Sequence, residues 1–348
     1  MRKVLLCLLS IILLVSCAKK TEEGEKPLLI LRYGDNQPDY YPTTRAARYF
    51  SQRVEEKSDG RIKIEVYGDG RLGNENDVFR MVEYGGVDFM RLSIGTLSAF
   101  YPEFQILQLP YLFSSSAHMW NVLDGKVGDY FLSILNGDSI GLSWFDAGAR
   151  SVYTIEKIDT LSDLQDKVIR TQENDKMEEI FSLLGASTIQ IPYGSVYSEL
   201  MRKTIDGAEN NFPSYMYTGH SDVARFVFLD EHMRLPEIMV MSRKVMEEIK
   251  AIDEDLLDVI KEAALEAGIY ERQLWNEEEE KAKRDAIIKG CIVTYPSYDE
   301  IEKWKEAVSP IYDTLDAESM KIVEEIKSLG ECIIQQNDLT QSSSFTPL

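Results

Sequence analysis

The sequence predicts an α/β fold in two lobes, each built on a mainly parallel sheet. The first predicted strand, Leu28 to Gly34, and the second, Ile62 to Tyr67, flank a predicted helix from about Thr44 to Lys57. A strand–helix–strand unit of this spacing usually joins two parallel strands. The chain has 348 residues and is 44% hydrophobic, which suits two domains of ordinary size with substantial cores.

Apolar segments separated by turns continue this pattern along the chain. Further strands are predicted at Val87 to Gly95, Leu142 to Phe145, Val168 to Ile169, Thr188 to Ile191 and Cys291 to Tyr295. Helical spacing of leucine, isoleucine and alanine extends from Asp253 to about Lys289. A helix of this length either bridges two lobes or breaks into two helices near Gly268.

The segment around Arg170 gives the clearest indication of a ligand site. Val168 and Ile169 lead into Arg170, and a turn then leads into a helix that begins at Asp175 and stops at Gly185. Open α/β sheets bind ligands at the carboxyl ends of their strands, where Arg170 is expected. A guanidinium presents a flat fork of donors that suits one carboxylate.

Other polar side chains follow predicted strands and complete a candidate site. They are Asn36, Glu75, Arg91, Arg150, Gln172, Asn210 and Asn211. Arginines bind carboxylates, whereas amides and an acid bind hydroxyls, so the set predicts a site for a hydroxylated acid. Two alternatives stay open: the arginines pair with internal acids, or the two asparagines cap a turn. Arg150 is expected in the loop that follows the strand ending at Phe145.

A literal GxGxxG motif occurs at Gly68 to Gly73, with Asp88 at a distance typical of a ribose-binding acid. The preceding strand alternates apolar residues with Lys63 and Glu65, whereas a dinucleotide-binding strand is a continuous buried run. Asp88 also precedes its strand instead of following one. We therefore expect turn glycines here and no nucleotide site.

The sequence predicts no catalytic residues, no metal site and no cofactor. His118, His220 and His232 are scattered, and the motifs GxSxG, HExxH and Walker A are absent from the sequence. The acids are too numerous for any two to be chosen as a glycosidase pair.

The N-terminal segment has the features of an export signal. Arg2 and Lys3 precede an apolar run from Val4 to Val15, which is shorter than the roughly 20 residues of a membrane span. The run ends in Leu-Val-Ser-Cys17, which resembles a bacterial lipobox. We predict a signal peptide over 1–16, lipidation of Cys17 and a tether over 17–26, which gives an extracytoplasmic lipoprotein with a soluble body. An ordinary signal peptide with an incidental cysteine is the alternative.

Charge and cysteine content narrow the function further. The formal net charge of −21 becomes 36 − 59 = −23 once Arg2 and Lys3 are removed, which argues against nucleic acid as a partner. It does not exclude an anionic ligand, because exposed charges are screened beyond about 8 Å. A disulfide between Cys291 and Cys332 is left open.

Several motifs in one order resemble the solute-binding subunits of TRAP (tripartite ATP-independent periplasmic) transporters, the DctP family. They are YGDNQPDYYP, GRLGNENDVF, VDFMRLS, LPYLF, WFDAGARSVYT, VIRTQEN and IDGAENNFPSY, followed by a long helix with Trp275. The resemblance implies a periplasmic-binding-protein-like fold with mixed, mainly parallel sheets, a hinge and a lobe-spanning helix. Lobe I is expected at 27–148 plus about 232–270, lobe II at 149–231 plus about 271–334, and a disordered tail at 335–348.

The resemblance also implies a function. The arginine matching Arg170 clamps the ligand carboxylate, and the asparagine matching Asn210 lies nearby. The protein would be a monomeric binder, not an enzyme, and would deliver its ligand to a membrane permease driven by an ion gradient. The ENN–P, LGNE and DAGAR segments are closest to members that bind uronates such as glucuronate or galacturonate.

The exact ligand stays open at this point. Thr171 and Phe212 differ from the residues expected in the uronate group. The alternatives are a C4-dicarboxylate, keto acid or sialic acid as ligand, an exported enzyme that acts on uronate-containing saccharides, and an adhesive lipoprotein.

Overall fold

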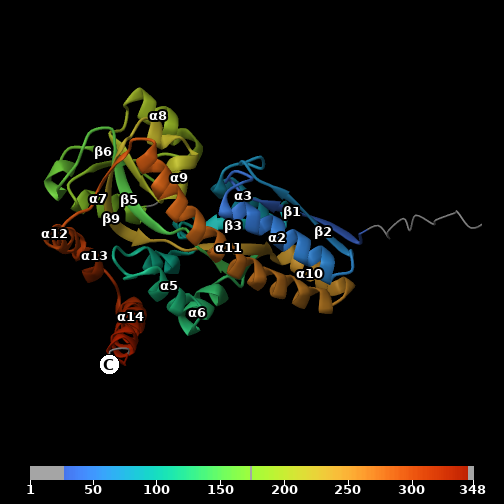
Figure 1. Ribbon diagram of the computed structural model, residues 1–348. Coiled ribbons are helices and arrows are strands. Elements are labelled where there is room, and N and C mark those ends of the chain that lie inside the picture. The colour runs from blue at the N-terminus through green and yellow to red at the C-terminus, as the bar shows by residue number, and fades with distance from the viewer. Residues whose placement is uncertain (1–26, 173–174, 344–348) are drawn as a thin grey trace, which may run out of the picture.

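The computed structural model describes residues 27–172 and 175–343, with side chains as far as residue 330. Two mixed sheets, each covered by helices, form the two lobes of an α/β fold (Figure 1), which confirms the predicted fold class. The predicted signal peptide, the lipidated Cys17 and the tether lie outside the described residues.

The first sheet has five strands and combines parallel with antiparallel pairs. In spatial order they are β2 (Ile62–Tyr67), β1 (Leu29–Gly34), β3 (Phe89–Ser93), β10 (Glu237–Ser242) and β4 (Ser139–Phe145). β1 pairs parallel with β2 and β3, whereas β10 is antiparallel to both β3 and β4. The chain therefore returns to this sheet with β10 after it has built most of the second sheet.

The second sheet has six strands. In spatial order they are β11 (Ile292–Thr294), β9 (Phe226–Arg234), β5 (Ala149–Thr154), β8 (Gly207–Asn210), β6 (Val168–Thr171) and β7 (Ser187–Gln190). β5 is antiparallel to β8 and β9, and β6 runs parallel to β7 and β8. Arg150 lies inside β5, so its predicted place in a loop was wrong. The strand pairing of Ala149 with Arg234 begins immediately after the connection from β4.

Helices cover the faces of both sheets. They are α2 (Pro42–Lys57), α3 (Glu75–Tyr84), α4 (Ile94–Leu97), α5 (Ser116–Leu123), α6 (Lys126–Ile134), α7 (Asp175–Leu183), α8 (Val196–Arg202), α9 (Phe212–Tyr217), α10 (Arg243–Ile252), α12 (Tyr298–Val308) and α13 (Pro310–Asp313). α2 places Phe50 and Val54, both fully buried, against the apolar face of the first sheet. The short 3₁₀ segment η1 (Pro102–Gln108) places Phe104 and Leu107 in the core.

Helix α11 (Asp255–Ile288) is one continuous helix that contacts both lobes. It packs on α2 and β4 of the first lobe and on α9 of the second, and Figure 1 shows it crossing between them. Of the two alternatives left open, the bridging helix is therefore the right one. Gly268 permits this packing, because a Cβ atom there would lie 2.9 Å from the carbonyl oxygen of Trp144.

The segment from Asp146 to Gly148 links β4 of the first sheet to β5 of the second. Its backbone is tied to α11, since the amide of Asp146 donates to Glu271 Oε2 at 2.8 Å. Gly148 has a φ of +63°, which suits glycine, and its amide donates to Asp146 Oδ1 at 2.7 Å. The bridging helix and the inter-lobe link thus form one unit.

The C-terminal helix α14 spans Ala317–Ser343. Its last residues overlap the tail expected over 335–348, and the disorder of that tail stays a prediction. None of the helices in the described part of the chain has both the length and the apolar character of a membrane span.

Candidate functional site

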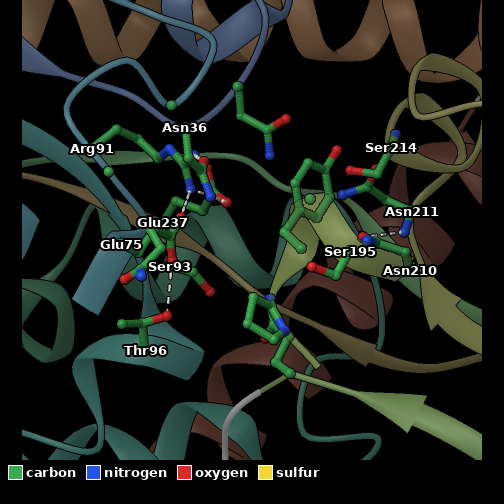
Figure 2. A pocket seen from close by; sticks show the side chains of 18 of the residues that line it. Asn36, Glu75, Arg91, Ser93, Thr96, Ser195, Asn210, Asn211, Ser214 and Glu237 are labelled. Atoms are coloured by element: carbon green, nitrogen blue, oxygen red, sulfur yellow. Dashed lines mark hydrogen bonds and ion pairs between the residues drawn. The ribbon is translucent and has the colours of Figure 1, made fainter. Parts of the chain in front are cut away.

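A cavity of about 380 Å³ lies between the two lobes. Eight of its lining residues are those that the sequence singled out: Asn36, Glu75, Arg91, Arg150, Arg170, Gln172, Asn210 and Asn211. Figure 2 shows the residues of the first lobe, among them Asn36, Arg91 and Glu237, across the cavity from Asn210 and Asn211 of the second. The structure thus brings the whole predicted set together, while the contact of each with a ligand stays a prediction.

Strand ends and helix starts position these side chains. Arg170 lies in β6, just before its carboxyl end, and Asn210 is the last residue of β8. These strands are parallel neighbours, so their carboxyl ends meet at the same edge of the sheet. In the first lobe, Glu75 begins α3 and Arg91 is the central residue of β3.

All the hydrogen-bond donors of the Arg91 guanidinium are used within the first lobe. Its Nε and Nη2 donate to Asp35 Oδ1 at 3.2 and 2.7 Å, and its Nη1 donates to Glu237 Oε1 at 3.1 Å and to Glu75. Nη2 also donates to Asn36. These bonds use all five donors of the guanidinium. Arg91 therefore follows the alternative in which an arginine pairs with internal acids.

Arg150 is also held by an internal acid. Its Nη2 donates to Glu209 Oε1 at 2.8 Å and to the Glu209 carbonyl at 3.0 Å, and its Nε bonds the same carboxylate. Nη1 donates to Asn210 Oδ1 at 3.1 Å. Only one donor remains for a ligand.

Arg170 differs from both. It is 2% exposed, and its Nε and Nη2 donate to the carbonyl oxygen of Ile191 at 2.8 and 2.6 Å. Three donors remain unused, and no carboxylate of the described residues forms an ion pair with it. Burial lowers the pKa of Arg170, and Glu209 offsets this only in part. A buried cation of this kind is stabilised by an anion that enters the cavity.

The two asparagines have different roles. Asn211 caps α9, since its Oδ1 accepts the amide of Ser214 at 2.8 Å, and its Nδ2 donates to the carbonyl of Ala147 at 2.9 Å. Here the capping alternative holds. Asn210 Oδ1 accepts from Arg150 and from the amide of Asn211, while its Nδ2 has no partner among the described residues.

Sequence reasoning missed several lining residues, including Gln37, Asp69, Thr96, Tyr193, Ser195, Ser214 and Glu237. Glu237 is the most informative, because its Oε2 is buried without a hydrogen-bond partner in the described structure. An acid directly before the apolar run Ile-Met-Val-Met was the available signal, and β10 itself was not predicted. Gln172, which the sequence did identify, likewise has a buried Oε1 without a partner there.

The GxGxxG stretch lies beside the cavity as a turn. Asp69, Gly70 and Gly73 have positive φ angles, and all three line the cavity. Asp88 accepts the amide of Arg32 at 2.6 Å in the first sheet. The stretch therefore shapes the cavity wall, as expected of turn glycines.

The histidines bond to the protein itself. His118 contacts the carbonyl of Ile326 at 2.7 Å, His220 the hydroxyl of Tyr153 at 2.8 Å, and His232 the carboxylate of Asp230. In the described part of the chain, no three His, Cys, Asp or Glu side chains are grouped to hold a metal ion. Cys291 is buried and forms no disulfide within the described residues, and the side chain of Cys332 lies outside them.

Buried ionisable groups behind the cavity predict a pH dependence of stability. Burial opposes charge on His232, but Asp230 and Glu209 outweigh it and raise its pKa from 6.5 to about 9. Burial raises the pKa of Glu237 from 4.5 to about 8. Both groups bind protons more tightly in the folded state, so their contribution is lost as pH rises through these values.

We therefore expect the free energy of unfolding to fall as pH rises, from about pH 4.5 to 8 through Glu237 and from about pH 6.5 to 9 through His232. Urea denaturation at a series of pH values measures this. His232→Asn and Glu237→Gln should each flatten the slope, whatever their effect on the absolute stability. A slope that stays unchanged in both variants would contradict the assignment.

Comparison with known proteins gives one consistent result. The model of the bacterial extracellular solute-binding protein family 7, DctP, matches residues 33–319. A solute-binding protein of Chromohalobacter salexigens is 34% identical over 278 residues, which cover 79% of this chain and 81% of the relative.

Solved structures of TRAP solute-binding proteins are similar to this chain. A TRAP periplasmic solute-binding protein of Xanthobacter autotrophicus with bound β-D-galacturonate has a TM-score of 0.81 and 34% identity, and covers 86% of this chain and 99% of its own. One from Chromohalobacter salexigens with bound D-glucuronate has a TM-score of 0.82 and 31% identity, with the same coverage. Proteins of this family bind solutes outside the cytoplasm and are not enzymes. The chain belongs to the DctP family of extracellular solute-binding proteins of TRAP transporters.

Proposed function

We propose that the protein captures a uronate, such as glucuronate or galacturonate, in the cavity between its lobes. Arg170 is the observation that carries this proposal. Of the three arginines that line the cavity, it alone keeps three donors unused and has no carboxylate partner among the described residues. A ligand carboxylate supplies that partner with bidentate geometry.

The remaining polar groups suit the hydroxyls of a sugar ring. Asn210 offers an amide donor, and Gln172 and Glu237 offer oxygens that lack partners in the described structure. Buried polar atoms without partners cost free energy, which hydroxyl contacts recover. The galacturonate and glucuronate bound to the two related structures have this combination of one carboxylate and several hydroxyls.

Calorimetric titration with D-galacturonate and D-glucuronate tests the proposal. A bidentate clamp with several hydroxyl contacts should give a dissociation constant of about 1 μM or lower, which corresponds to about 8 kcal/mol. The ligand should be recovered chemically unchanged. Tighter binding of a keto acid or sialic acid than of either uronate would contradict the uronate assignment.

Delivery to a TRAP permease and attachment through Cys17 complete the proposed role. The family supports the permease, and the Leu-Val-Ser-Cys17 sequence supports the lipid anchor. The anchor requires a mature N-terminus at Cys17 that carries acyl chains, and mass spectrometry of the membrane fraction reads this directly. A mature chain that begins elsewhere would exclude the anchor.

A further inference from the structure

The two walls of the cavity carry charge of opposite sign. The wall of the second lobe presents Arg170, with its unused donors, beside Arg150. The wall of the first lobe has the carboxylates of Asp35 and Glu75 and the carboxyl group of Glu237 around the single guanidinium of Arg91. An elongated ligand that enters with its acid group on Arg170 therefore meets net negative charge at the first lobe.

Arg91 cannot attract an anion to this wall. All five of its donors are bonded within the lobe, and its side chain is only 1% exposed. A second carboxylate on the ligand would gain no hydrogen bond from Arg91 and would lie beside carboxylates of like charge. Such a contact is repulsive and is weakly screened in a buried site.

Glu75 and Glu237 are placed to bind hydroxyls instead. Glu75 is fixed at the first residue of α3, where its Oε2 accepts from the Thr96 hydroxyl at 2.8 Å while its Oε1 bonds Arg91. Glu237 bonds Arg91 through Oε1, and its Oε2 is buried and has no partner in the described structure. A carboxylate oxygen accepts hydrogen bonds that a sugar hydroxyl can donate and an ionised carboxylate cannot.

We infer that Glu75 and Glu237 make the first-lobe wall a specificity filter that accepts hydroxyls and rejects a second carboxylate. The ligand class is then a polyhydroxylated monoacid, and six-carbon sugar diacids are excluded. This inference rests on the proposed function, because the contact of the first carboxylate with Arg170 decides which end of the ligand faces the filter.

The test compares two probes that share their carbon chain: D-galacturonate and galactarate, in which carbon 1 is also a carboxylate. Titration calorimetry on the wild-type protein should give at least 100-fold tighter binding of galacturonate. Glu75→Gln should narrow that ratio at least tenfold, because glutamine keeps the shape and removes the like charge. Glu237→Gln should narrow it at pH 9, above the raised pKa of Glu237, and less at pH 7. Glu83→Gln, on the same helix α3 but not among the cavity-lining residues, is the matched control and should leave the ratio unchanged.

The outcomes separate this inference from the proposed function. If the wild-type protein binds galacturonate and galactarate equally well, the filter is refuted while uronate binding stands. If it binds neither acid, the proposed function fails, and the filter fails with it. A 100-fold ratio that neither glutamine variant narrows also refutes the filter. Should Glu75→Gln not unfold cooperatively, Glu237→Gln measured at pH 9 decides.

Discussion

Replacing Arg170 with alanine is expected to weaken uronate binding by at least 100-fold while the protein stays folded. The variant loses a bidentate, charge-assisted contact, whose hydrogen bonds are worth about 1.5–3 kcal/mol each. Among the described residues Arg170 bonds only to the carbonyl of Ile191, so the fold loses little. Calorimetric titration measures the affinity, and thermal unfolding verifies the fold.

Two further variants sharpen this prediction. Arg170→Lys keeps the positive charge without the planar fork and should bind with intermediate affinity. Arg202→Ala is the control within the same lobe, because Arg202 lies exposed at the end of α8 and, in the described part of the chain, pairs only with Glu199. Wild-type-like binding by Arg170→Ala would remove the basis of the proposed function.

Replacing Arg91 with methionine is expected to destabilise the protein by about 3–5 kcal/mol, because removal of one partner leaves buried charges uncompensated. The cost should be large here, since the carboxylates of Asp35, Glu75 and Glu237 all depend on this one guanidinium. Urea denaturation of the wild type and the variant measures the difference.

The pH dependence of the Arg91→Met variant provides a second observation. Without the cation, the three carboxylates bind protons more readily in the folded state, so the variant should regain stability as pH falls. Arg48→Met removes an exposed arginine that pairs with Asp39 and should change stability by less than about 1 kcal/mol. A loss of that small size in Arg91→Met would contradict the structural role of Arg91.

Local sequence signals predicted much of the fold. The second strand was placed at its observed bounds, Ile62–Tyr67, because alternation of apolar and charged residues is a property of the segment itself. Helical spacing of apolar residues likewise predicted the helix that begins at Asp175, and the apolar pair Val168 and Ile169 predicted the strand at whose end Arg170 was expected. The antiparallel strands β9 and β10 were missed, since they depend on pairing with distant segments.

In the candidate site, too, local sequence predicted which residues take part, whereas their contacts depend on the tertiary structure. The eight residues were predicted because they lie near the ends of predicted strands, and all eight line one cavity. Local sequence could not tell which arginine keeps free donors, because that depends on tertiary partners. Arg91 meets Asp35 across 56 residues and Glu237 across 146. Arg150 likewise meets Glu209 only through the pairing of β5 with β8.

A double-mutant cycle between Arg170 and the ligand carboxylate tests the central claim most directly. Titration calorimetry would compare D-galacturonate with its methyl ester on the wild-type protein and on Arg170→Ala. The account predicts that the ester binds the wild type at least 100-fold more weakly than the acid, and that this difference disappears in the variant. An equal penalty for the ester in both proteins would show that the carboxylate is bound elsewhere.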